Sequence, residues 1–241
     1  VSGLATVAGG VLAAYVAMLR SYVPDIAGHL LAASVMSAPA ALAVAKLMVP
    51  ETGTPQTSGQ VPALELERSA NLFDAAARGA LSGMKLAAYV GAILVAFMSL
   101  LALINLMLGR LGGWLGVGDL RLERLFGWLF AVPAWLMGVP AHDCATVGQL
   151  IGEKTAVNEM VAYTHLARLL AENPSALSPR AIVVATYALC GFSNFLSIGI
   201  LIGGLGGMAP QRRAEVAELG LRAALAGSLA CFLTASIAGL L

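Results

Sequence analysis

A single acidic residue inside an apolar stretch is the strongest candidate for chemistry in this sequence. Glu159 stands in TAVNEMVAY, residues 155–163, a segment that is otherwise apolar enough for membrane depth. A charge there costs about 2.5–3.5 kcal/mol on insertion scales. We predict that Glu159 is a ligand-binding or proton-carrying carboxylate in a cavity; a structural ion pair with Lys154 or Arg168, or a position at the water interface, is the alternative. Asn158 either braces this carboxylate or caps a helix.

A second group of polar residues interrupts a long apolar segment. Residues 181–210 are uncharged, but Gly191, Asn194 and Ser197 lie in their middle. Asn194 and Ser197 are three apart and therefore share a face of a helix. Polar groups at this depth are expensive unless they face protein or a watery cavity. They serve either a ligand site or interhelical hydrogen bonds, and Phe192 either packs or stacks on a flat ligand.

The first ten residues contain a third candidate. Thr6 lies between Gly3 and Gly9 in an apolar run. A membrane threonine usually bonds to its own helix. An unwound turn would instead free its hydroxyl and the Val7 carbonyl, and such hard oxygen ligands suit a small cation such as Na⁺.

Composition excludes several classes of protein. Of the 241 residues 59% are hydrophobic and 11% are charged, against about 25% charged in soluble domains. Lipid is therefore the expected surroundings. The net charge of +1 gives no field that would attract nucleic acid, so no nucleic-acid partner is expected. The three cysteines have no paired spacing and are read as core residues without redox chemistry.

Signatures of enzymes are also lacking. The sequence has no H-E-x-x-H, G-x-S-x-G or P-loop motif. His142, Asp143 and Cys144 are consecutive and cannot easily aim at one another, so we interpret them as a linker. We therefore predict that the protein is not an enzyme, with a membrane enzyme or protease as the rival class.

The apolar segments predict an all-α polytopic membrane protein. Uninterrupted runs at 26–45, 86–108 and 223–241 predict transmembrane helices, and the 23 residues of 86–108 would reach about 34 Å. Residues 1–19 and 181–210 predict broken helices. Residues 125–166, with two prolines, predict a re-entrant hairpin whose arms are joined at residues 142–144.

The predicted organisation has four parts. They are the first broken helix with an intact helix (1–49), a loop followed by an amphipathic interfacial helix (50–84), a long scaffold transmembrane helix (85–109), and an interfacial segment, hairpin, second broken helix and last helix (110–241).

The order of a broken helix followed by an intact one occurs twice, which suggests an inverted repeat of the kind found in secondary transporters. The doublet Arg212–Arg213 predicts a cytoplasmic loop before the last helix, which places the C-terminus on the outer face.

Several segments together resemble the C-terminal part of the concentrative nucleoside transporters. They are SVMSAPAALA (34–43), PET (50–52), NEMVAY (158–163), ATYALCGF (185–192) and TASIAG (234–239). The resemblance implies an inverted-repeat transporter that forms a homotrimer in the plasma membrane. Residues 86–108 would then be the helix beside the trimer axis, and 125–166 the second hairpin.

The resemblance also implies roles for single residues. Glu159 would bind the ribose hydroxyls, with Asn158 as its brace, and Asn194 and Ser197 would also contact the ribose. Phe192 and Val11 would contact the base. The Thr6 hydroxyl and the Val7 carbonyl would form part of a sodium site. Ser193 and Leu196 stand where family members often have small residues.

The implied function is a symporter that imports nucleosides with a sodium gradient and uses no organic cofactor. Glu159 keeps a proton-coupled symporter open as an alternative, because a desolvated carboxylate can hold a proton; a non-transporting receptor or channel of the same fold is a second rival. The family's first hairpin would precede Val1. We therefore expect this chain to hold most of the ribose side of the site and only part of the sodium site, and not to transport by itself.

Overall fold

The computed structural model describes residues 1–54, 69–118 and 120–241, and every regular element within these ranges is helical. The elements are α1 (Ser2–Ala5), α2 (Gly9–Leu19), α3 (Ile26–Met48), α4 (Leu72–Leu115), α5 (Leu122–Leu136), α6 (Cys144–Ala156), α7 (Glu159–Glu172), α8 (Pro179–Leu189), α9 (Phe195–Met208), a 3-10 turn η1 (Pro210–Arg212) and α10 (Arg213–Ala238). Most of the predicted loop and the start of the predicted interfacial helix, residues 55–68, lie outside the described residues.

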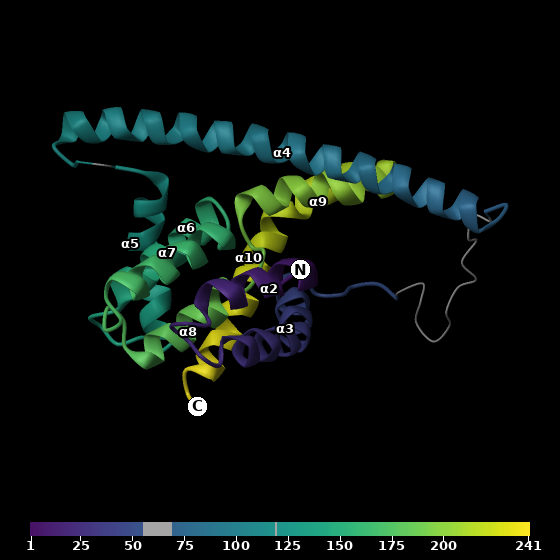
Figure 1. The fold of residues 1–241 in the computed structure, drawn as a ribbon. Helices are drawn as coiled ribbons and strands as arrows, with labels where there is room; N and C mark the ends of the chain where they lie inside the picture. Colours follow the sequence, from purple (N-terminus) through teal and green to yellow (C-terminus); the bar gives the residue numbers. More distant parts are fainter. Residues whose placement is uncertain (55–68, 119) are drawn as a thin grey trace.

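The helices form a bundle with one long helix along its side (Figure 1). α10 packs against α1, α3, α8 and α9 and so joins the two ends of the chain. α4 packs on α9 and touches α5. The largest buried side chains gather where α2, α6, α7 and α8 meet, and they include Tyr15, Tyr163 and Leu189.

Both predicted breaks are present. α1 and α2 are separated at residues 6–8, and α8 and α9 are separated at residues 190–194. An intact helix follows each break, α3 in the first case and α10 in the second. The last helix starts at Arg213, ten residues before the apolar run that predicted it, because a helix continues through its polar first turns.

The prediction of separate helices at 64–84 and 86–108 is wrong for the described residues. α4 runs without interruption for 44 residues from Leu72 to Leu115, a length of about 66 Å. Its start is fixed by a reciprocal cap: the Asn71 side chain accepts from the Asp74 backbone N–H, and the Asp74 carboxylate accepts from the Ala70 N–H. No proline follows to end the helix, so the polar and apolar parts become one rod.

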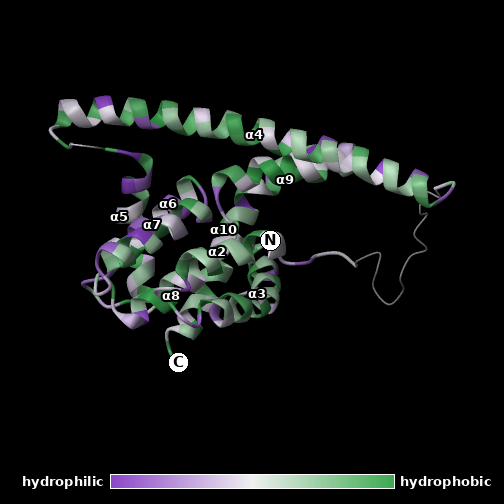
Figure 2. Cartoon of the chain, viewed as in Figure 1, coloured by the Kyte–Doolittle hydropathy of each residue, from purple (hydrophilic) through white to green (hydrophobic). Residues whose placement is uncertain are grey.

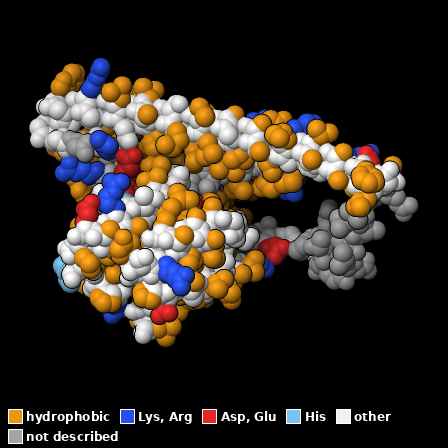
Figure 3. All heavy atoms as spheres, in the orientation of Figure 1, with side chains coloured by type: hydrophobic (Ala, Val, Ile, Leu, Met, Phe, Trp, Pro, Cys, Tyr) orange, Lys and Arg blue, Asp and Glu red, His pale blue; other side chains and the backbone are white. Residues whose placement is uncertain are grey.

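α4 is apolar, and most of its surface is exposed apart from its contacts with α9 and α5. Four helical segments of the described chain are long and apolar enough to cross a membrane: Ser2–Leu19, Ile26–Met48, Leu72–Leu115 and Pro210–Ala238. The most apolar stretch of α4 has no buried residue. Hydrophobic residues run along α4 and α9 (Figure 2), and hydrophobic side chains are distributed along the visible face of α4 (Figure 3). Such a surface is suited to lipid or to other protein, in agreement with the predicted transmembrane helices.

The predicted hairpin at 125–166 is three helices, and its tip is not at residues 142–144. α5 and α6 do pack closely, because Gly127 and Gly148 allow their backbones to meet; a Cβ on Gly148 would lie 2.6 Å from the Gly127 carbonyl oxygen. A second turn at Val157–Asn158 joins α6 to α7 and carries Glu159. We call residues 144–172 the α6–α7 hairpin. Pro133 lies inside α5 and marks no tip.

The turn between α5 and α6 has a structural role. Asp143 is buried, and its carboxylate accepts hydrogen bonds from the backbone N–H and hydroxyl of Ser178 at the start of α8. The Cys144 thiol points to the carbonyl groups of Val139 and Pro140. His142 Nε2 does lie 3.4 Å from the Asp143 carboxylate, contrary to the expectation that these neighbours cannot face one another, but the Cys144 thiol faces backbone carbonyl groups and completes no nucleophile–base array.

Candidate functional site

Glu159 is buried at the tip of the α6–α7 hairpin. Its side chain is 4% exposed, and it is the first residue of α7. One carboxylate oxygen accepts from the Tyr15 hydroxyl at 3.1 Å, and the other accepts from the Asn194 amide at 3.1 Å. In the part of the chain that the structure describes, no ion pair joins it to Lys154 or Arg168. A carboxylate has about four acceptor positions, so two remain for the hydroxyl groups of a ligand.

Asn158 caps α7, which was one of its two predicted roles. Its side-chain oxygen accepts from the Val161 backbone N–H at 2.9 Å. This cap satisfies a donor at the helix start and begins α7 directly at Glu159. Asn158 thus positions the carboxylate through the backbone, and contact of Asn158 with a ligand stays a prediction.

Asn194 and Ser197 lie together at the start of α9. Asn194 is 2% exposed, and its side-chain oxygen accepts from the Ser197 backbone N–H at 2.8 Å while its amide faces Glu159. Ser197 is 5% exposed as a residue, and its hydroxyl has no hydrogen-bond partner among the described residues. Phe192, in the connection before Asn194, is half-buried, and no ring contact is found for it in the described part of the chain.

α2, the helix after the first break, supplies the other side of the carboxylate. Val11 and Tyr15 are four residues apart on α2 and share a face; Val11 is half-buried, and Tyr15 is fully buried against Tyr163 with ring centroids 4.5 Å apart. The Thr6 hydroxyl lies 2.9 Å from the Ser34 hydroxyl on α3 and does not bond to its own helix. Among the described residues, no backbone hydrogen bond uses the Val7 carbonyl.

The second break touches α1 at Gly191. A Cβ at this position would lie 2.7 Å from the Leu4 carbonyl oxygen and 2.5 Å from the Cys231 sulfur. The Cys231 thiol in turn donates to the Ala5 carbonyl at 3.4 Å. Glycine is therefore required by the close approach of two backbones. The structure brings Glu159, Asn194 and Ser197 to one place and sets the first break beside them.

Sequence reasoning missed two buried side chains at this place. Tyr15 was not considered, although its position four residues after Val11 signals the same helix face. Lys154 was weighed only as an ion-pair partner of Glu159. It is 1% exposed, and it donates to the Ala188 carbonyl and the Ser193 hydroxyl. No spacing in the sequence reveals these partners, which are 34 and 39 residues away.

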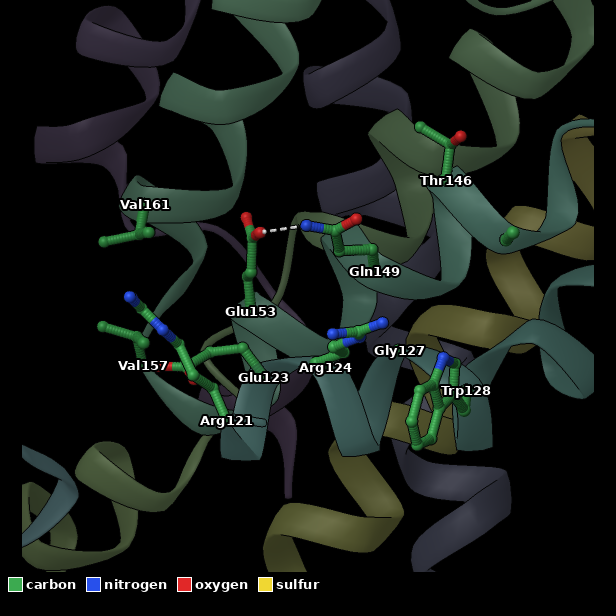
Figure 4. A pocket seen from close by; sticks show the side chains of 11 residues that line it. Arg121, Glu123, Arg124, Gly127, Trp128, Thr146, Gln149, Glu153, Val157 and Val161 are labelled. Carbon is green, nitrogen blue, oxygen red and sulfur yellow. Dashed lines mark hydrogen bonds between the residues drawn. The ribbon is translucent and has the colours of Figure 1, made fainter. Parts of the chain in front are cut away.

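A separate cavity of about 570 Å³ lies at the surface between α5, α6 and the start of α7 (Figure 4). Polar and charged side chains that line it are engaged within the protein: Gln149 donates to Glu153, Glu153 also contacts His165, and Arg124 donates to the Gly118 carbonyl. It shares no lining side chain with the contacts of Glu159, so we do not place the functional site there.

The family of the chain follows from comparison with known proteins. The family model described as "Na+ dependent nucleoside transporter C-terminus" matches residues 29–239. The chain belongs to the Na+ dependent nucleoside transporter family. This agrees with the predicted resemblance, and the match covers both the α6–α7 hairpin and the second break.

Individual relatives of the chain support its membership of the nucleoside transporter family. The chain is 48% identical over its full length to an uncharacterized transporter of Haemophilus influenzae and covers 57% of that protein. It is 42% identical over 99% of its length to the nucleoside permease NupC of Helicobacter pylori and covers 55% of it. The chain therefore spans just over half the length of these curated relatives. Their names describe transporters, in line with the prediction that the chain is not an enzyme.

Solved structures show the same fold. A structure of a CNTnw variant in an outward-facing state matches with a TM-score of 0.84 at 46% identity, over 99% of this chain and 56% of the other. A structure of CNTnw in an inward-facing substrate-bound state matches with a TM-score of 0.77 at 47% identity, over 99% and 55%.

Proposed function

We propose that the protein carrying this chain is a membrane symporter that imports nucleosides by alternating access, driven by a sodium gradient. The observation that carries the proposal is the buried Glu159 carboxylate, which accepts hydrogen bonds from Asn194 at the second helix break and from Tyr15 on α2. An ionised acceptor in a dry place binds hydroxyl groups more strongly than a neutral one. A ribose offers two neighbouring hydroxyl groups. Membership of the nucleoside transporter family supports the same substrate class.

The other predicted residues complete the substrate site in this proposal. The Ser197 hydroxyl has no partner among the described residues and is placed to contact the sugar together with Asn194. Phe192 and Val11 are half-buried apolar side chains at the two breaks and would contact the base. Asn158 acts through the cap that fixes Glu159.

Sodium would bind at the first break. Thr6 has an extended backbone at the end of α1, and its hydroxyl and the Val7 carbonyl are hard oxygen ligands of the kind that a small cation takes. The Val7 carbonyl has no backbone partner in the described chain, which fits this use. The site is partial, and further ligands from outside this chain would complete it. The printed description of the family also supports sodium.

The fold suggests how the transporter is built. The α6–α7 hairpin fits a re-entrant hairpin, since its two helices of 13 and 14 residues are each too short to span a bilayer. α1–α3 and α8–α10 would be the inverted copies. The uncovered α4 would be the scaffold of a homotrimer in the cell membrane, and the Arg212–Arg213 doublet would place the C-terminus outside.

Uptake of labelled uridine into proteoliposomes tests this function, with the protein as its gene encodes it. An inward sodium gradient, an inward proton gradient and no gradient are compared, each with Glu159→Gln alongside. Native mass spectrometry of the same sample tests the trimer.

We expect sodium-driven uptake that Glu159→Gln abolishes. Proton-driven uptake would keep the transporter and refute the sodium site at Thr6. Uptake of no nucleoside under any gradient, or binding without exchange of labelled for unlabelled nucleoside, would refute the proposed function.

A further inference from the structure

Lys154 is a buried cationic side chain that the proposed site does not use. It lies on α6 one turn before the hairpin tip, and it is 1% exposed. Its Nζ donates to the Ala188 carbonyl oxygen at 3.1 Å and to the Ser193 hydroxyl at 2.8 Å. Among the described residues it has no carboxylate partner within ion-pair distance. Burial of such a group is costly unless its surroundings replace its lost hydration.

The surroundings of Lys154 are the end of a helix. Ala188 is in the last turn of α8, where carbonyl groups lack intrahelical partners and the helix dipole is negative. A cation is therefore favoured at this position. A second carbonyl in the same turn, that of Thr186, accepts from the Tyr163 hydroxyl at 2.7 Å. Both donors come from the α6–α7 hairpin, so the hairpin caps α8 from the side.

The second acceptor links Lys154 to the substrate site. Ser193 immediately precedes Asn194, whose amide bonds to Glu159 at 3.1 Å. Lys154 and Glu159 thus lie on either side of the hairpin tip and hold adjacent residues of the connection between α8 and α9. The hydrogen bond from Lys154 holds Ser193 in place, and this in turn positions the backbone of Asn194, whose side-chain amide bonds to Glu159.

We propose that Lys154 is a positioning residue: its amino group acts as a tethered cation at the second helix break and sets the Asn194 amide against Glu159. Its effect on nucleoside binding rests on the proposed function, whereas its effect on the break itself does not. The two breaks then differ in a specific way. At the first break, the Thr6 hydroxyl and the Val7 carbonyl would bind a sodium ion from solution. At the second break, the Ser193 hydroxyl and the Ala188 carbonyl bind the Lys154 amino group, a cation that belongs to the chain.

A first experiment needs no nucleoside. Cys190 is the first residue of the second break and is fully buried, so its labelling by N-ethylmaleimide, localised by mass spectrometry, reports how tightly the break is held. In Lys154→Met we expect labelling about tenfold faster, the factor for loss of a hydrogen bond from a charged group. Ser193→Ala should give a smaller increase in the same direction. Unchanged labelling in both variants would overturn the proposal.

Thr155→Val is the matched control. Thr155 follows Lys154 on α6, but among the described residues its hydroxyl bonds only to the Ile151 carbonyl of its own helix, at 2.8 Å. The change keeps the size of the side chain and leaves the second break untouched, so Cys190 labelling should stay at the unsubstituted rate. Equal acceleration in Thr155→Val and Lys154→Met would mean that any change in α6 loosens the break, which would refute a specific role.

A second experiment uses a double-mutant cycle on the KM for uridine. If Lys154 acts through Asn194, the double variant Lys154→Met, Asn194→Ala is no worse than Asn194→Ala alone. Independent structural damage would instead multiply the two effects. We also expect the increase in KM of Lys154→Met to persist at every sodium concentration.

The two experiments separate the two proposals. A protein that takes up no nucleoside refutes the proposed function, while Cys190 labelling still decides the role of Lys154. Uptake that depends on Glu159, together with multiplied effects in the cycle, refutes Lys154 as a positioning residue and keeps the transporter.

Discussion

The Asn194 side-chain amide donates a hydrogen bond of 3.1 Å to the Glu159 carboxylate, across 35 positions of sequence. Glu159 begins α7, and Asn194 caps α9. The positive ends of two helix dipoles therefore lie beside one carboxylate and favour its charged form as a hydrogen-bond acceptor. This arrangement is suited to recognition of neutral hydroxyl groups, and the predictions below test it.

Removal of one ribose hydroxyl should weaken binding. We expect 2′-deoxyuridine or 3′-deoxyuridine to bind less tightly than uridine by about 1–3 kcal/mol, because a buried acceptor is left unpaired. Glu159→Gln should bind ribosides and deoxyribosides with similar, weaker affinity. Competition of each nucleoside against uridine uptake measures the difference in the unsubstituted protein, and equilibrium binding of labelled nucleoside measures it in Glu159→Gln, which is expected not to transport. Equal competition by both sugars in the unsubstituted protein would exclude Glu159 as the ribose ligand.

The two tasks of Asn194 can be separated. Asn194→Ser keeps an oxygen that can cap α9 but cannot reach Glu159, so uridine affinity should fall while thermal stability is nearly kept. Asn194→Ala should also lose the cap, at about 0.5–2 kcal/mol. Thermal unfolding in detergent and uptake kinetics measure the two effects. A serine variant with unchanged KM would argue against contact of the amide with substrate.

Much of this site could be predicted from polar residues in apolar segments. Glu159, Asn194 and Gly191 are conspicuous for that reason, and both helix breaks were found from glycine and polar interruptions. The hairpin tip was misplaced because Pro133 and Pro140 are strong turn signals. The chain reverses instead at residues 157–158, which contain neither proline nor glycine.

Long-range partners were out of reach for a different reason. Tyr15 bonds to Glu159 over 144 residues, and Lys154 bonds to Ser193 over 39. Such contacts depend on how helices pack, and no local periodicity encodes them. The length of α4 was also missed, because hydropathy divides a helix at polar turns whereas its backbone does not.

Thr6→Val should weaken the response to sodium. The substitution keeps the shape of the side chain and removes the hydroxyl, so the sodium concentration for half-maximal uptake should rise while uptake at saturating sodium is largely retained. Thr6→Ser, which keeps the hydroxyl, is the control. The measurement is uridine uptake against sodium concentration. If the two variants respond alike, the sodium ligand is not the Thr6 hydroxyl.

Gly191→Ala should destabilise the protein by about 1–3 kcal/mol, the usual cost of an overpacked core. The added Cβ would meet the Cys231 sulfur and the Leu4 carbonyl oxygen. Cys231→Ala should rescue it only in part, because the backbone oxygen at 2.7 Å remains. Gly28→Ala on α3 has open space around it and should be nearly neutral. Thermal unfolding of Gly191→Ala, of the double variant Gly191→Ala, Cys231→Ala and of Gly28→Ala measures these differences; full rescue by Cys231→Ala would show that the backbones are not the limiting contact.

The contact of Gly191 with Leu4 restricts how the molecule can move. Leu4 lies in α1, before the first break, and Gly191 lies in the second break; Tyr15–Glu159 and Ala5–Cys231 also tie α2 to α7 and α1 to α10. Moving α1 and α2 away from these partners would sever all three links. A conformational change that exposes the site to the other side of the membrane would therefore cost least free energy if both breaks moved together as one rigid unit, alongside the exposed α4.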